Sequence, residues 1–131
     1  MEFSTMLFHA HSGLRYLVLL AGAIAFFYAL VAAVRSRPWD RTGRVLVGIF
    51  TGALDLQILL GAALIFVWEF YPALWGHLTM MLLAGVSAHV ASVLNRKRPP
   101  EARSPLTATL GVAGALVLIV GGIAAIQRSI L

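Results

Sequence analysis

Four long runs of apolar residues divide the chain, and polar residues gather in the short stretches between them. A helix that crosses a bilayer needs roughly 20 predominantly apolar residues. Each run meets that length, so we expect four spanning helices, over residues 6–34, 45–68, 74–95 and 106–127. All five prolines fall between these runs or at their edges, where a missing backbone donor does not interrupt a helix.

Composition makes lipid the expected surroundings of these helices. The chain has 131 residues, of which 60% are hydrophobic and 11% are charged, whereas a soluble domain is about 25% charged. A soluble domain of this size also keeps much of its surface in water, so it has no core large enough for so many apolar side chains. We therefore expect an all-α fold, a single transmembrane domain over residues 1–131 that forms an up-down-up-down four-helix bundle.

The basic residues predict how the bundle is oriented. Eight of the ten Lys and Arg residues lie within residues 35–44 and 96–105, in the first and third connections. Positively charged loops stay in the cytoplasm, so we expect both termini and the second connection outside, in a bacterial inner membrane. These loops account for the net charge of +5, and nucleic acid is not an expected partner.

The residue types present restrict the chemistry that the chain can perform. It has no cysteine, which excludes disulfides, thiolate metal sites, iron–sulfur clusters and covalently attached c-type haem. The sequence also has no phosphate-binding loop, nucleophile elbow or zinc motif. Function is therefore expected from polar groups within the spans or from contact with other membrane protein subunits.

Two histidines are expected at matched depth near the outer end of the bundle. His11 and His77 belong to spans that begin on the outer side, and at about 1.5 Å per residue each lies within about two turns of that boundary. Histidines on two helices of a bundle can bind one haem iron from both faces, and Arg15, one turn after His11, can pair with a haem propionate. The alternatives are interfacial histidines bonded to a neighbouring helix and an arginine that extends to the headgroups.

Asp55 stands near the middle of the second span, where a charge costs about 2.5–3.5 kcal/mol on the insertion scale. Gly48, Gly52 and Asp55 recur at helical spacing, and small residues four apart allow close helix packing, so we expect this stripe to face the bundle interior. His89 is expected at similar depth on the third span, which predicts a buried Asp55–His89 pair. Such a pair either locks two helices together or handles protons or a quinone head group.

Three motifs resemble those of one group of membrane proteins. They are HSGLRY at residues 11–16, LQILLG at residues 56–61 and HLTMM at residues 77–81. In these the chain is similar to small four-helix bacterial membrane proteins described as cytochrome b-like. The resemblance implies haem b with His11 and His77 as ligands. Members of that group often carry a histidine where this chain has Asp55, so a metal role at this position is not carried over, and His89 matches no fixed histidine of the group.

Three hypotheses for function follow. The first is a small b-type haem protein that transfers electrons in the membrane, with quinone as a candidate partner. The second is a cofactor-free accessory subunit of a larger respiratory or photosynthetic membrane complex, which uses the same helices as packing surface. The third is a small proton-coupled transporter that uses Asp55.

Overall fold

The computed structural model describes residues 2–67 and 71–126, and within them it contains four long helices and one short 3₁₀ turn. These are α1 (Phe3–Val34), α2 (Arg41–Val67), α3 (Leu74–Lys97), η1 (Pro100–Ala102) and α4 (Pro105–Ala125). Each of the four α-helices is long and apolar enough to cross a membrane, which confirms the predicted all-α four-helix protein. The ends expected at Trp68 and Gln127 for the second and fourth spans lie outside the described residues.

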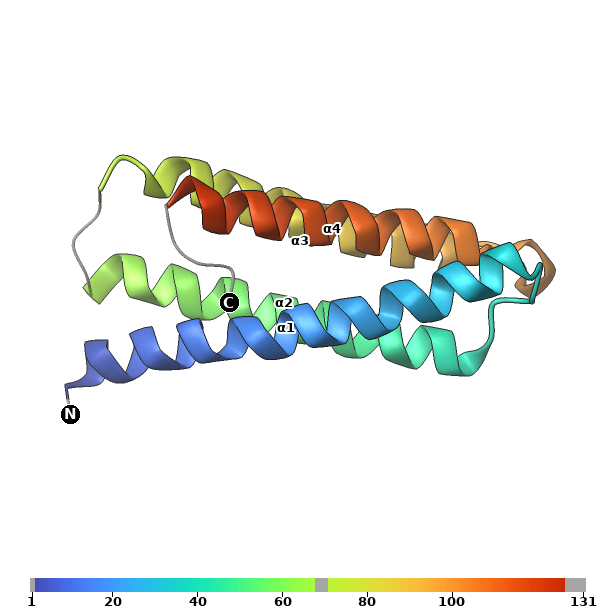
Figure 1. Cartoon of the computed structure of the whole chain (residues 1–131), viewed down its shortest axis with the longest axis horizontal. Helices are drawn as coiled ribbons and strands as arrows, with labels where there is room; N and C mark the ends of the chain where they lie inside the picture. Colours follow the sequence, from blue (N-terminus) through green and yellow to red (C-terminus); the bar gives the residue numbers. More distant parts are fainter. Residues whose placement is uncertain (1, 68–70, 127–131) are drawn as a thin grey trace.

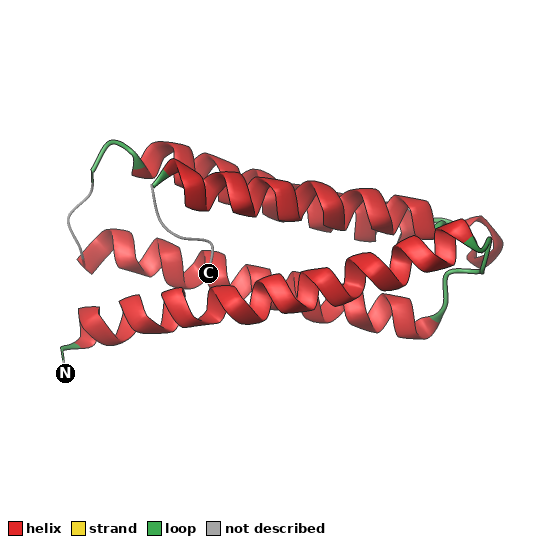
Figure 2. Cartoon of the chain, viewed as in Figure 1, coloured by secondary structure: helices red, strands yellow, loops and turns green. Residues whose placement is uncertain are grey.

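The helices form two layers (Figure 1). α1 and α2 lie side by side in one layer, α3 and α4 lie side by side in the other, and α1 also packs on α4. The short loops from α1 to α2 and from α3 to α4 lie together at one end of the bundle, and α1 begins at the other end (Figure 2). Contact between α2 and α3 is much less extensive than within either layer, so the bundle is loosest along that side.

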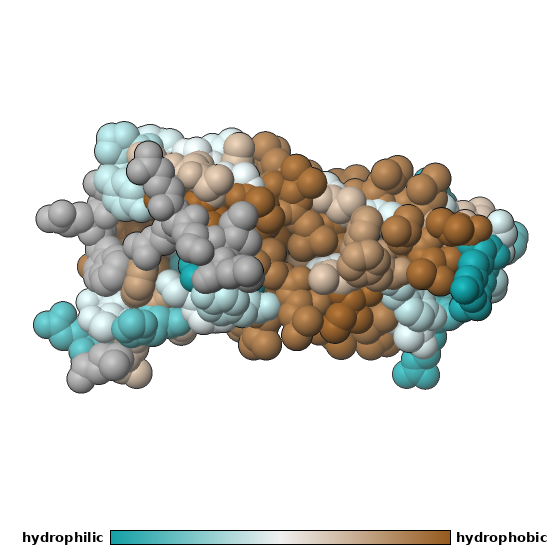
Figure 3. Space-filling view, viewed as in Figure 1, coloured by the Kyte–Doolittle hydropathy of each residue, from teal (hydrophilic) through white to brown (hydrophobic). Residues whose placement is uncertain are grey.

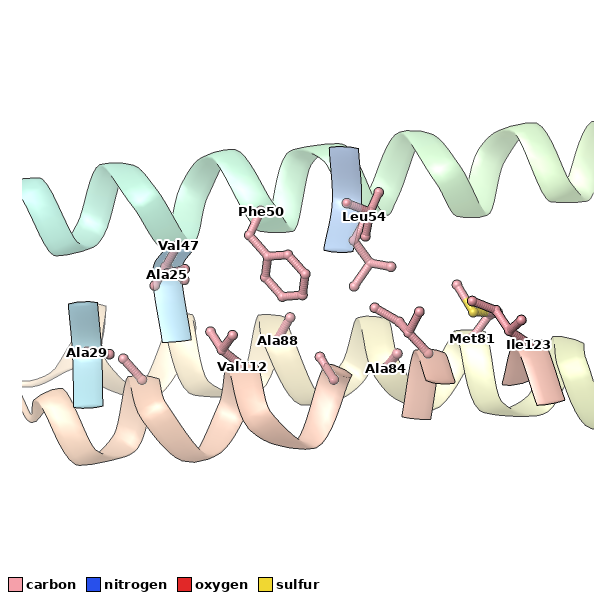
Figure 4. Packing of buried hydrophobic residues seen from close by; sticks show 14 of the residues in the cluster. Ala25, Ala29, Val47, Phe50, Leu54, Met81, Ala84, Ala88, Val112 and Ile123 are labelled. Carbon is pink, nitrogen blue, oxygen red and sulfur yellow. The ribbon is translucent and has the colours of Figure 1, made fainter. Parts of the chain in front are cut away.

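Large side chains of α2 fill the space between the layers. Phe50 and Leu54 are fully buried and point from α2 toward the α3–α4 layer, where Ala84, Ala88 and Val112 meet them (Figure 4). Small alanines opposite large residues let the layers interdigitate without voids. The face of α2 that carries Phe50 and Leu54 is therefore the one that faces the interior.

α3 and α4 approach each other closely because small residues line their contact. A Cβ atom at Gly111 would lie 2.2 Å from the Cβ of Ala91, so no residue larger than glycine fits there without a shift of the helices. The hydroxyl of Ser87 donates to the carbonyl of Gly111 over 2.9 Å. Small residues and interhelical hydrogen bonds of this kind are what hold helices together in lipid.

Asp40 fixes the first connection, just before α2 begins. Its carboxylate accepts a hydrogen bond from the Tyr28 hydroxyl at 2.5 Å and one from the backbone N–H of Gly43 at 2.8 Å. The second bond satisfies a donor that the helix itself leaves unpaired. Both bonds, that from Tyr28 foremost, lower the pKa of Asp40 below its ordinary value.

The outer surface of the bundle suits lipid. The face in Figure 3 carries apolar residues over its centre and polar residues toward its two ends. Large apolar side chains are exposed on all four helices, among them Leu20, Ile49, Val86 and Val117. In water such a surface would be unstable, whereas in a bilayer it is the normal outer face of a multi-pass protein.

Candidate functional site

His11 of α1 and His77 of α3 come together between the two layers of the bundle. Their ring centroids are 6.4 Å apart and their planes are nearly perpendicular, at 88°. Both rings line one cavity of about 360 Å³. The two histidines that the sequence places at matched depth are thus brought to a common space from different helices.

The cavity combines an apolar wall with a few polar groups. Most of its lining is aliphatic, as at Ile58, Leu78 and Ile119. Ligand sites in proteins have this character and range over about 300–1,000 Å³. The polar side chains that line it are those of His11, Ser12, Arg15, Gln57, Tyr71 and His77.

The hydrogen bond of His77 determines which of its ring nitrogens is free. Its Nδ1 lies 2.8 Å from the carbonyl oxygen of Gly122 on α4. A carbonyl oxygen can only accept, so Nδ1 carries the proton, and in the neutral ring Nε2 is left with an open lone pair. Histidines that bind metals usually donate their other N–H to a carbonyl or carboxylate in this way. His77 is therefore prepared to act as a ligand through Nε2.

Two residues of α2 hold His11 in place. The side-chain Nε2 of Gln57 donates to the backbone carbonyl of His11 over 2.7 Å, which ties α2 to α1. One turn later, a Cβ atom at Gly61 would lie 3.1 Å from Cε1 of the His11 ring, so the glycine leaves room for the imidazole. Position 61 therefore controls where the ring lies.

Three polar atoms on residues that line this cavity have no hydrogen-bond partner within the described part of the chain. They are Nδ1 of His11, Nε of Arg15 and Oε1 of Gln57, and each is buried. The rest of the Arg15 guanidinium lies on Tyr16, with Nη2 2.8 Å from the tyrosine hydroxyl and Cζ 4.8 Å from the ring centroid. Each of the three atoms is covered by neighbouring protein atoms, so it does not itself face the cavity.

The distance between the two rings is compatible with two imidazoles bound to one metal ion. With a metal–imidazole bond of about 2 Å and a ring nitrogen about 1 Å from its centroid, two imidazoles on opposite sides of one ion have centroids about 6 Å apart. The observed 6.4 Å is close to this value, and it also lies within the range of edge-to-face packing of two rings. No group of three or more His, Asp or Glu residues that could hold a metal ion occurs within residues 2–67 and 71–126.

Asp55 and His89 are hydrogen-bonded to each other on a different part of the bundle. Nε2 of His89 lies 2.8 Å from Oδ1 and 2.9 Å from Oδ2 of Asp55. The side chains are 51% and 48% exposed for His89 and Asp55 respectively, so the expected burial of this pair is wrong. A Cβ atom at Gly48 or Gly52 would meet nothing within 4 Å, so the expected inward stripe of small residues is wrong as well.

The reason for this difference is the rotation of α2. Its interior face is taken by Phe50, Leu54 and Gln57, all buried, because large side chains are needed to fill the space between the layers. Gln57 is about 200° around the helix from Asp55, so an inward Gln57 requires an outward Asp55. Asp55 therefore does not line a path between the four helices.

Gln57 and Gly61 are site residues that the sequence alone does not identify. Both belong to the LQILLG motif at residues 56–61, and they lie one turn apart on the face of α2 that lines the cavity. Helical periodicity could have found them, because they lie on the side of α2 opposite to Asp55.

Searches against protein-family models, curated proteins and solved structures find no match to this chain. Its function is therefore argued from the site itself.

Proposed function

We propose that this chain is a small b-type haem protein of the bacterial inner membrane that transfers electrons, with His11 and His77 as the axial ligands. The observation that supports the proposal best is that these two rings, from different helices, meet in one cavity while the Nδ1 bond of His77 to Gly122 leaves its Nε2 open. Haem supplies a one-electron couple when it is bound, and the protein tunes it through ligand identity, burial and hydrogen bonding.

The surroundings of His77 and His11 orient both ligands. The carbonyl of Gly122 keeps the His77 proton on Nδ1 and leaves Nε2 free to bind a metal. On the opposite layer, the ring of His11 packs on Gly61 and its backbone is tied to Gln57. Ligands held on helices by such contacts keep their position more strictly than ligands on loops.

Arg15 supplies a positive charge to the same cavity. Its buried Nε has no partner within the described residues, and a guanidinium forms strong charge-assisted hydrogen bonds with carboxylates. Haem b carries two propionate groups, so Arg15 is the residue that we assign to one of them.

The position of the site suggests where electrons are exchanged. The cavity lies near the end of the bundle where α1 begins, away from the basic loops. If positive loops are cytoplasmic, the site is near the outer leaflet, where membrane quinone is a candidate electron partner. Most of the cavity wall is aliphatic, and apolar surroundings of a haem raise the influence of nearby charges on its redox potential.

The test is a reduced-minus-oxidised visible spectrum of the detergent-purified full chain, expressed in cells supplied with haem, with pyridine haemochrome quantitation. We expect a Soret band, a sharp α band and about one haem per chain. A folded, helical protein without these bands would overturn the proposal. It would leave the role of a cofactor-free accessory subunit, which the outward Asp55–His89 pair also suits because it needs a neighbour.

A further inference from the structure

The Asp55–His89 pair is exposed in the part of the bundle that crosses the membrane. Asp55 lies near the middle of α2, which runs from Arg41 to Val67, and about half of each side chain is accessible from outside the bundle. Acidic and basic residues within spans almost always face a bundle interior or a water-filled cavity, because hydrocarbon solvates them poorly. A single copy of this chain therefore leaves a polar pair facing lipid.

The surface around this pair is shaped for close approach by another helix. Gly48 and Gly52 lie about two turns and one turn before Asp55, respectively, on the same side of α2, and a Cβ atom at either would meet nothing within 4 Å. Val86, one turn before His89 on α3, is exposed beside them. We call these five residues the α2–α3 face. Glycines four residues apart let two membrane helices come into backbone contact.

We propose that the α2–α3 face is a dimer interface that takes a second copy of this chain, related by a twofold axis along the membrane normal. Such an axis puts every residue of the face at the same depth as its counterpart, so the Asp55–His89 pair meets the polar pair of the partner in the bilayer. In a twofold interface, contacts are reciprocal. The charges are self-complementary, since each copy offers one carboxylate and one imidazole.

The hydrogen-bonding capacity of the pair supports this arrangement. Nε2 of His89 bonds both oxygens of Asp55, and Nδ1 has no partner within the described residues. Each carboxylate oxygen of Asp55 can accept more than one hydrogen bond. When both ring nitrogens of His89 carry a proton, the N–H at Nδ1 can donate to the partner's Asp55, and the reciprocal bond forms by symmetry. Both polar groups are then removed from lipid without an unpaired donor.

Cross-linking through engineered cysteines tests the interface directly, because the chain has no cysteine of its own. Gly52→Cys would lie close to its counterpart near the twofold axis, and oxidation in native membranes should give a disulfide-linked dimer. Gly13→Cys is the matched control, since Gly13 on α1 also faces outward with nothing within 4 Å. Equal cross-linking at both positions, or none at position 52, would overturn the proposal. A cross-link from position 52 to a different protein only would also overturn it.

A second measurement does not depend on new thiols. Energy transfer between donor- and acceptor-tagged full-length chains in neutral-lipid vesicles should report association of the wild type. Gly52→Ile should weaken that association by about tenfold or more, and Gly13→Ile should leave it unchanged. Asp55→Leu combined with His89→Leu should also weaken it, while helical circular dichroism stays the same. Association that is insensitive to all of these changes, or is absent in the wild type, contradicts the interface. Neither measurement depends on whether haem is bound.

Discussion

The imidazole of His11 stands almost perpendicular to that of His77, at 88°, with 6.4 Å between the ring centroids. Edge-to-face aromatic packing also gives centroid distances of about 4.5–7 Å, so the distance alone agrees with a plain packing contact. The two explanations differ in what they say of His77. Its Nδ1 donates to the Gly122 carbonyl, which leaves Nε2 of the neutral ring with an open lone pair, as a metal ligand requires.

Substitution of His77 tests whether this histidine is a haem ligand and His89 is not. His77→Ala should lower the haem content by more than about tenfold, because one axial ligand is lost. His89→Ala is the matched control on the same helix, since His89 contacts Asp55 and lies outside the cavity, and it should keep about the wild-type haem content. Pyridine haemochrome assays of both purified variants provide the measurement. Equal haem retention in the two variants would refute the ligand assignment.

A larger residue at position 61 should disturb the site through His11. In Gly61→Val the side chain would push against Cε1 of the imidazole, which is 3.1 Å from a Cβ atom there, and overpacking of this kind costs about 1–3 kcal/mol. We expect lower haem content and a shifted α band. Gly13→Val, which adds the same atoms on an open surface, should leave the spectrum unchanged. An unaltered spectrum for Gly61→Val would show that the His11 imidazole does not bind haem from the position described here.

Replacement of Gln57 by leucine should affect the site more than the stability. Gln57→Leu loses the hydrogen bond to the His11 carbonyl, which in membrane proteins is worth about 0.6 kcal/mol on average. It also removes the buried unpaired Oε1, which offsets part of that loss. We expect a change in unfolding free energy within about 1 kcal/mol, with a shifted midpoint potential because His11 is less firmly held. A large loss of stability with an unchanged potential would instead mark Gln57 as a purely structural residue.

The sequence predicts the fold well because lipid imposes simple rules. Four apolar runs of sufficient length are four helices, and the prolines and basic residues mark their ends. Boundaries shift by a few residues, as at Phe3 where α1 begins earlier than expected. His11 and His77 also meet, since equal depth on helices of one bundle brings them to the same level.

The rotation of each helix about its axis is what the sequence leaves open. In lipid both faces of a spanning helix are apolar, so hydrophobic periodicity gives little information about which face is buried. Small residues were expected inside, yet Gly48 and Gly52 face outward and Phe50 and Leu54 fill the interior. Which face is buried depends on packing volume across the two layers, and that requires the three-dimensional arrangement.

The cap at Asp40 predicts a loss of stability in acid. The pKa of this carboxyl is lowered in the folded protein by the Tyr28 hydroxyl and the Gly43 N–H, so its contribution is present above the unfolded pKa of about 3.9 and is lost as pH falls through the lower folded value. Thermal unfolding in detergent should therefore show wild-type stability that declines as pH falls toward and below the unfolded pKa of about 3.9. Asp40→Ala should be less stable at pH 7, toward the lower end of the about 0.5–2 kcal/mol typical of a lost cap because the residue is exposed to solvent.

The loss of unfolding stability in acid should be smaller in Asp40→Ala than in the wild type, because the carboxyl group that titrates is gone. Tyr28→Phe is the graded control, since it removes one donor at 2.5 Å and keeps the bond from Gly43 at 2.8 Å. In this variant the folded pKa of Asp40 should be closer to the ordinary value, so the fall in stability should begin at the same pH as in the wild type, be smaller, and end at a higher pH. Parallel pH profiles for all three proteins would show that Asp40 does not couple protonation to folding.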